Sequence, residues 1–165
     1  MKNYTLRPAL PQEKLTAVTN TLARWLPGPV DDTAVSQWSL AEWEAAEWVV
    51  YWQNALPWLV ARVEEAQIEV PEGVNGRLRT VNDASGERSR RTLSACAEIL
   101  DAFRQAGIQV VLLKGAVLSP FYYPDPLLRP LADLDLLIRP QDIAASRKIM
   151  LKQLGYRYYS RSAED

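Results

Sequence analysis

The sequence contains no histidine and a single cysteine, Cys96, among its 165 residues. Without histidine, the chain cannot supply a Ser-His-Asp or Cys-His catalytic set, nor a histidine-based zinc site. Acid–base or metal chemistry must then use carboxylates, lysine or tyrosine, and oxygen ligands select hard cations such as Mg²⁺ or Mn²⁺. A lone cysteine cannot form a disulfide within the chain, which fits a reducing compartment.

The chain also lacks an excess of charge and long apolar runs. Its net charge is −1, and no Lys/Arg tract predicts non-specific binding to nucleic acid or anionic membranes. The first residues have no signal-peptide core, and no run is long and apolar enough to span a bilayer. The hydrophobic content of 48% allows a buried core. We therefore expect a soluble, cytoplasmic protein of about one domain, with no membrane partner.

Residues 1–86 are predicted to form a helical N-terminal region. The expected helices cover residues 12–26, 32–38, 39–55 and 58–68. Ser39 and Glu42 have the spacing of a capping box, and residues 71–86, rich in Gly, Asn and Asp, are expected to be mainly loop. The tryptophans gathered in this region are interpreted as helix-packing core, with an aromatic ligand box as the alternative.

Charges of opposite sign separate along the chain. The helical region is acidic, and a basic cluster follows it, formed by Arg77, Arg79, Arg88, Arg90 and Arg91. The acidic residues are interpreted as a solvated face. The basic cluster could hold a polyphosphate, or it could be a solvated helix face that pairs with the acidic region.

Residues 87–165 are predicted to alternate helices and strands, which indicates an α/β (α+β) unit with a small mixed sheet and flanking helices. The expected elements are a helix over 87–106, strands over 108–113, 132–138 and 156–160, and helices over 115–122 and 140–154. Gly107 and Gly155 are in position to end the first and last of these helices. Pro140 is placed to start the last helix, with Ile143 and Ile149 on its apolar face.

Two short motifs lie between Gly107 and Arg139. Asp133 and Asp135 alternate with leucines, so on a strand they would share one face, roughly 6–7 Å apart. Two carboxylates on one face favour a divalent cation between them. Lys114 and Gly115 stand where a strand turns into a helix, where free N–H groups, the helix dipole and a lysine favour phosphate.

Neither motif is specific alone. A Lys-Gly pair is common at strand–helix turns, and two aspartates near a strand start can be a cap and a turn. Together they would bring a phosphate cradle and paired carboxylates to one place, which metal-dependent triphosphate chemistry requires.

The ordered set of motifs resembles the uncharacterised nucleotidyltransferase family of the DNA polymerase β-like superfamily. The matching positions are Leu113, Lys114, Gly115, Ala116, Tyr123, Pro124, Arg129, Asp133, Asp135, Leu137, Pro140, Asp142, Gly155 and Tyr156. The resemblance covers roughly residues 87–159. It implies a nucleotidyltransferase-like core over 87–165, with Mg²⁺ (or Mn²⁺) as cofactor and an NTP as substrate.

The same resemblance implies roles for individual residues. Asp133 and Asp135 would be the catalytic metal ligands, and Lys114, Gly115, Ala116 and Arg129 would bind the nucleotide. Ala116 stands where the broader superfamily has serine. The reaction implied is Mg-dependent transfer of a nucleoside monophosphate from an NTP to an unknown acceptor, which could be a small molecule, a protein or RNA.

One feature of the superfamily is not found in the sequence. A third carboxylate on a later strand is expected, and the carboxylate residues that follow the last predicted strand are only Glu164 and Asp165. The core is therefore expected to be incomplete at its C-terminus, with a homodimer or partner chain completing the sheet. The alternative functions are a catalytically incomplete binding or regulatory module that acts with a partner chain, and a purely structural α/β domain in which the aspartates are incidental.

Overall fold

A computed structural model of the chain describes residues 7–28 and 32–158. The first part is helical. Its helices are α1 (Gln12–Trp25), α2 (Thr33–Ser36), α3 (Leu40–Trp52), α4 (Leu56–Glu65) and α5 (Glu72–Gln105). The second part adds two strands and further helical segments. These are β1 (Val110–Leu113), α6 (Gly115–Tyr122), η1 (Pro126–Leu128), β2 (Asp135–Ile138), η2 (Pro140–Asp142), α7 (Ile143–Lys148) and a π-helical turn, η3 (Ile149–Gln153).

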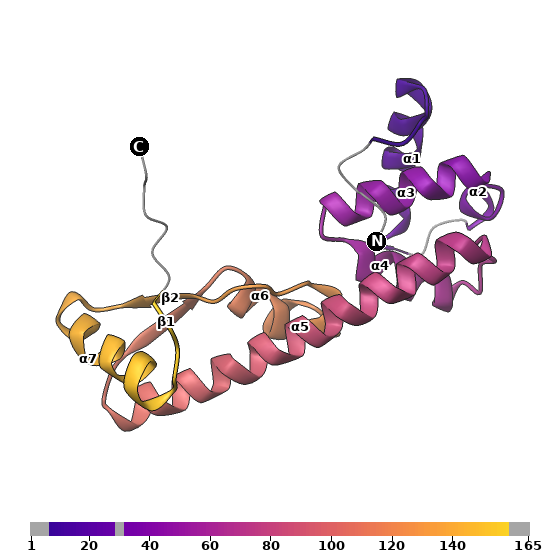
Figure 1. The fold of residues 1–165 in the computed structure, drawn as a ribbon. Coiled ribbons are helices and arrows are strands. Elements are labelled where there is room, and N and C mark those ends of the chain that lie inside the picture. Colours follow the sequence, from indigo (N-terminus) through magenta and orange to yellow (C-terminus); the bar gives the residue numbers. More distant parts are fainter. Residues whose placement is uncertain (1–6, 29–31, 159–165) are drawn as a thin grey trace, which may run out of the picture.

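Helix α5 runs from the other N-terminal helices to the two strands (Figure 1), and it contributes side chains to two separate hydrophobic cores. Near its start, Val74 and Leu78 are buried among the side chains of α1, α3 and α4. Near its end, Ile99 and Phe103 pack with Ile108, the inner face of the sheet and η3. At about 1.5 Å per residue, the 34 residues of α5 extend for roughly 50 Å. The molecule is therefore a helical bundle and a small sheet unit, carried at opposite ends of one long helix.

The continuity of α5 contradicts the loop predicted over residues 71–86. Three glycines lie in this part of the helix, at positions 73, 76 and 86, and each costs about 1 kcal/mol relative to alanine. Burial of Val74 and Leu78 contributes about 1.5–3 kcal/mol for each side chain. Tertiary packing thus offsets the local propensity that favoured a loop.

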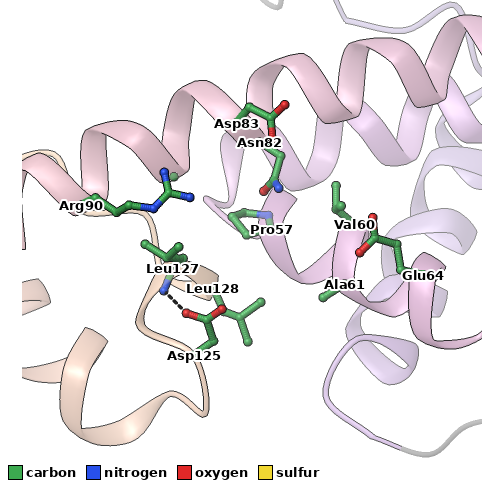
Figure 2. Close-up of a pocket in the computed structure, with 11 residues that line it drawn as sticks. Pro57, Val60, Ala61, Glu64, Asn82, Asp83, Arg90, Asp125, Leu127 and Leu128 are labelled. Carbon is green, nitrogen blue, oxygen red and sulfur yellow. Dashed lines mark hydrogen bonds between the residues drawn. The ribbon is translucent and has the colours of Figure 1, made fainter.

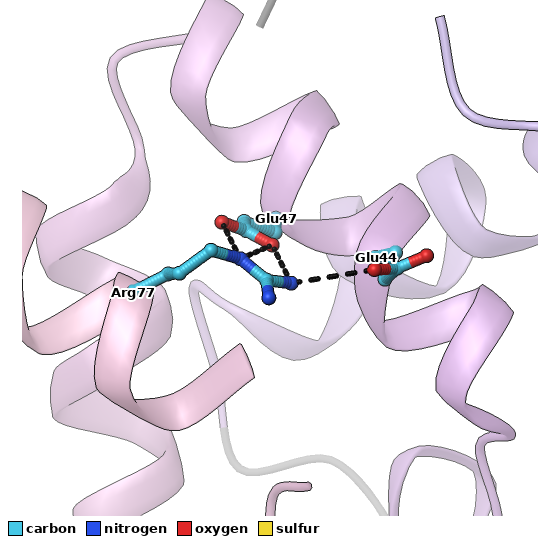
Figure 3. A network of polar contacts seen from close by, with 3 residues as sticks. All are labelled: Glu44, Glu47 and Arg77. Atoms are coloured by element: carbon cyan, nitrogen blue, oxygen red, sulfur yellow. Dashed lines mark hydrogen bonds and ion pairs between the residues drawn. The ribbon is translucent and has the colours of Figure 1, made fainter. Parts of the chain in front are cut away.

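A buried ion pair also holds this part of α5 against α3. Glu47 is fully buried, and its carboxylate accepts hydrogen bonds from Nε and Nη2 of Arg77 at 2.7–3.0 Å. Arg77 also reaches Glu44 at 3.5 Å (Figure 3). A second pair, Arg79 with Glu64, joins α5 to α4 at 3.0 Å. The predicted pairing of the basic cluster with the acidic region is confirmed for these two arginines, whereas Glu47 is an exception to the solvated acidic face.

Most other helix predictions are confirmed. Ser39 and Glu42 form the expected capping box at the start of α3. Trp25 and Trp43 are buried in the first core, as the packing interpretation predicted. Gly107 and Gly155 have φ angles of +70° and +72°, which suit residues that end helices. Ile143 is an exception, because it is exposed on α7 rather than part of the apolar face.

The sheet has two antiparallel strands, β1 and β2, paired from Val110 with Ile138 to Leu113 with Asp135. Its inner face packs on the second core, while Val111 and Leu137 are exposed on the outer face. The fold class, a helical region followed by a small mixed α+β unit, is confirmed. Both strands are shorter than predicted, and residues 156–158 form no strand. Instead the Tyr156 N–H bonds back to the Met150 carbonyl at 2.9 Å; residues 159 and 160 lie outside the described residues.

Candidate functional site

The turn between β1 and α6 has an unusual backbone conformation. Lys114 has φ 49° and ψ −121°, which costs roughly 1–3 kcal/mol for a residue with a side chain. Its carbonyl accepts hydrogen bonds from the N–H groups of Val117 and Leu118 at 3.2 and 2.9 Å, so it closes the first turn of α6. No side chain caps this helix start. The first N–H groups of α6 therefore have no intrahelical acceptor, as is usual at a helix N-terminus.

The strand register brings Lys114 to Asp135. Leu113, the last residue of β1, is opposite Asp135, the first residue of β2. Lys114 Nζ lies 3.0 Å from Asp135 Oδ2, with side-chain exposures of 75% and 39%. The hydrogen bond and charge of Asp135 raise the pKa of Lys114, and the charge of Asp133 adds to this effect. Two motifs that are about twenty residues apart in sequence thus meet at one edge of the sheet.

Asp133 lies just before β2, not within it as predicted. Leu134, Leu136 and Ile138 pack on the second core, while Asp133 and Leu137 are exposed. The alternation between core and solvent agrees with the prediction that the two aspartates face away from the core. The shortened strand leaves Asp133 on a segment to which the structure assigns no regular secondary structure.

Gly115 makes a close contact that the sequence does not reveal. A Cβ added to Gly115 would lie 2.7 Å from Leu131 Cδ1. Leu131 is itself buried, and its N–H donates a 3.0 Å hydrogen bond to the Ser89 hydroxyl on α5. The absence of a side chain at Gly115 therefore allows the segment before Asp133 to pack against the start of α6.

The other two predicted nucleotide-binding residues lie beside this contact. The Ala116 methyl group is buried, which leaves the backbone as the part of the residue that can meet a ligand. Arg129 Nε lies 4.0 Å from the position of a Cβ on Gly115. That Nε atom is buried and has no hydrogen-bond partner among the described residues. The structure thus brings Lys114, Gly115, Ala116, Arg129 and Asp135 to one end of α6.

Two buried serines support the site and were not identified from sequence. Ser89 holds Leu131, as described above, and Ser119 on α6 donates a 2.7 Å hydrogen bond to the Pro126 carbonyl. Ser89 is seven residues before Cys96 and fourteen before Phe103, which is a helical spacing shared with two buried residues. That spacing is a signal that could have identified Ser89; no comparable signal marks Ser119.

The donor set fits a hard divalent cation. Asp135 and Asp133 already act together on a cation, the Lys114 ammonium group. Mg²⁺ is commonly held by one or two carboxylates, with substrate phosphates and water completing its shell. In residues 7–28 and 32–158, no group of three or more Asp, Glu or Cys side chains has a geometry suited to a metal ion. A metal site at Asp133 and Asp135 would therefore draw two carboxylates from that part of the chain.

A cavity of about 200 Å³ lies between α4, α5 and η1 (Figure 2). Its acidic residues include Glu64 and Asp125, which already have partners. Glu64 pairs with Arg79, and Asp125 accepts the Leu127 N–H at 2.8 Å. Asp125 therefore stabilises the η1 turn, and Glu64 stabilises the contact between α4 and α5.

Comparison with known proteins gives one match. A family model described as "Uncharacterised nucleotidyltransferase" matches residues 39–165. The match begins at the cap of α3 and so includes α3, α4 and the whole of α5, well before the residues that carried the sequence resemblance. No curated protein and no solved structure matches the chain. None of the described helices has the length and apolar character needed to cross a bilayer.

Proposed function

Because the chain belongs to the uncharacterised nucleotidyltransferase family, we propose that it transfers a nucleoside monophosphate from an NTP to an acceptor, with Asp133 and Asp135 as metal ligands. Family membership supports nucleotidyl transfer as the general reaction. The observation that carries the proposed site is the 3.0 Å contact of Lys114 Nζ with Asp135 Oδ2, which joins the lysine–glycine turn to the aspartate pair.

The residues at this end of α6 have complementary roles in the proposal. Lys114 is exposed and flexible, so its ammonium group can leave Asp135 and pair with the β- or γ-phosphate when an NTP binds. The N–H groups at the start of α6, beginning at Gly115, form the positive end of the helix dipole and favour phosphate oxygens. Both interactions would hold the triphosphate without any change in the sheet.

The carboxylates would hold Mg²⁺ or Mn²⁺ beside the phosphates. Bound there, the cation would neutralise phosphate charge and polarise the α-phosphoryl group. Asp135 would exchange its contact with Lys114 for the metal, and Asp133, which is exposed just before β2, would turn toward the same position. The acceptor hydroxyl would lose its proton to water as its oxygen forms a bond to the α-phosphorus. The bond from that phosphorus to the pyrophosphate oxygen would break, and pyrophosphate would leave.

Calorimetric titration of Mg²⁺ and each NTP into the protein tests the site. We expect Asp133→Asn and Asp135→Asn to weaken Mg-dependent NTP binding by about tenfold or more, since each removes a charged ligand. The matched control is Asp101→Asn on α5, an exposed aspartate that pairs with Arg104. NTP affinity that is absent, or equal in the wild type and both site variants, would remove the proposed site.

Transfer itself is tested separately, with an NTP labelled at the α-phosphate and a cell extract as the source of acceptor. Retention of the α-label on an acceptor, lost in Asp135→Asn, supports the enzyme. NTP binding without transfer would favour the second candidate, a binding or regulatory module that acts with a partner chain. The observation that favours this candidate is the exposed apolar outer face of the sheet, at Val111 and Leu137.

A further inference from the structure

A second, larger cavity lies between the helical bundle and the turn that follows α6. Its volume is about 600 Å³, within the range of roughly 300–1,000 Å³ found for small-molecule sites. The rings of Trp58, Tyr122 and Tyr123 contribute to its wall, and Leu22, Leu26 and Leu128 add aliphatic surface. Trp58 and Tyr123 lie with ring centroids 6.0 Å apart. These side chains provide the flat apolar surfaces that aromatic compounds stack against.

The charge of the cavity wall has one sign. Arg129 is the charged residue among the described residues that line it, and no carboxylate does so. Its guanidinium carbon lies 6.0 Å from the centre of the Tyr123 ring, and its Nε is buried without a hydrogen-bond partner in the described part of the chain. The guanidinium group therefore gives the wall a positive charge, and an anionic group on a ligand would pair with it.

The cavity and the proposed nucleotide site share one residue, Arg129. Arg129 lines the cavity and has its Nε 4.0 Å from the position of a Cβ on Gly115. The cavity residues Tyr122 and Tyr123 lie at the far end of α6, about 12 Å from Gly115 at 1.5 Å per residue. A ligand that fills the cavity could therefore direct one end toward the start of α6.

We infer that this cavity binds the acceptor, and that the acceptor is a planar aromatic compound with one anionic group, a carboxylate or a phosphate. The acceptor role rests on the proposed function, whereas the binding of an aromatic anion does not. The ring would stack against Trp58 and the two tyrosines, and the anionic group would pair with Arg129. The cavity wall comes from α1 and α4 as well as from the sheet unit, so the helical bundle contributes to substrate choice.

Three probes distinguish the contribution of the aromatic ring to binding from that of the anionic group: 2-naphthoate, 2-naphthyl phosphate and the neutral 2-naphthamide. Titration of each into the full chain, in the absence of Mg²⁺ and NTP, should show one of the anions binding about tenfold or more tightly than the amide. Whichever anion binds more tightly identifies the group that Arg129 recognises. No binding of either anion, or equal binding of anion and amide, would overturn the inference.

Two variants and a control connect the effect to the cavity. Arg129→Met should reduce anion binding to the level of the amide while amide binding persists, which shows that the cavity is intact. Tyr122→Ala, at a side chain that is 74% exposed, should weaken all three probes. The control, Arg88→Met at an exposed position of α5 outside the cavity, should leave the preference for the anion unchanged. Preference that survives Arg129→Met would refute the role of this arginine.

Competition assigns the site. If MgATP binds without displacing the preferred anion, the cavity is separate from the nucleotide, as an acceptor site requires. Displacement by MgATP, with probe affinity falling in proportion to the nucleotide concentration, would assign the cavity to the nucleotide base and overturn the acceptor role. Asp135→Asn should bind the anion normally, so failure of nucleotide binding in that variant is distinguishable from failure of the cavity.

Discussion

Replacement of Arg77 by methionine should destabilise the protein more than any other single arginine-to-methionine change on the N-terminal half of α5. Methionine keeps much of the apolar stem and removes the guanidinium group, which donates three hydrogen bonds of 2.7–3.0 Å to Glu47. Glu47 is fully buried, so the change leaves a carboxylate in the core without this partner. Removal of one member of a buried ion pair costs about 3–5 kcal/mol.

The expected loss can be measured by thermal and urea unfolding followed by circular dichroism. For a chain of this size, about 3–5 kcal/mol corresponds to a decrease in Tm of roughly 6–20 °C. Arg77→Lys keeps the charge and loses the two-pronged geometry, so an intermediate decrease is expected. Arg79→Met is the matched control, because Arg79 and Glu64 are both more than half exposed and such pairs contribute about 0–1 kcal/mol. Equal losses of unfolding free energy for Arg77→Met and Arg79→Met would refute the argument that burial of Glu47 makes the Arg77 pair more stabilising.

Two further predictions concern the candidate site. The pKa of Lys114 is raised mainly by Asp135, so Asp135→Asn should lower it toward 10.5, as followed by the NMR shifts of the lysine side-chain carbons during a pH titration. Because the folded-state pKa is raised, the ion pair persists at lower pH and is lost as pH rises through that pKa. An unchanged titration in the variant would contradict the contact. Gly115→Ala should destabilise by about 1–3 kcal/mol through the 2.7 Å approach to Leu131, and Leu131→Ala should cost less in that background than in the wild type. Gly76→Ala, where a Cβ meets nothing within 4 Å, should instead stabilise by about 0.5–1 kcal/mol; destabilisation by both glycine changes would indicate general helix strain instead of the Leu131 contact.

Local patterns predicted most of the secondary structure, because the relevant interactions are short in range. The capping box of Ser39 and Glu42 depends on residues three apart, and the glycines at 107 and 155 end helices through their own backbone conformation. The loop predicted over 71–86 was wrong because its helix depends on a distant contact, between Arg77 and Glu47 thirty residues earlier. A single sequence shows the glycines that disfavour a helix but not the core that stabilises it.

The candidate site was predictable in composition but not in arrangement. Its motifs indicated which residues to consider, and the family match supports the family assignment. The pairing of Lys114 with Asp135 depends on the strand register, which brings Leu113 opposite Asp135. Trp58 has its ring beside Tyr123, sixty-five residues further along the chain, and no local pattern in the sequence indicates that pairing.

The support of the site comes less from the sheet than from α5. Each strand has only four residues and the outer face of the sheet is exposed, so the strand pair alone would be marginally stable. What fixes the segment before Asp133 is Leu131, held by its N–H to the buried Ser89 hydroxyl and by its contact with Gly115. Because Ser89 lies on the same helix as Arg77, α5 contacts both the helical bundle and the segment before Asp133. A nucleotide at the start of α6 and an aromatic anion beside Trp58 would then both be positioned by elements that pack on α5, which is the condition for transfer between two separate binding sites.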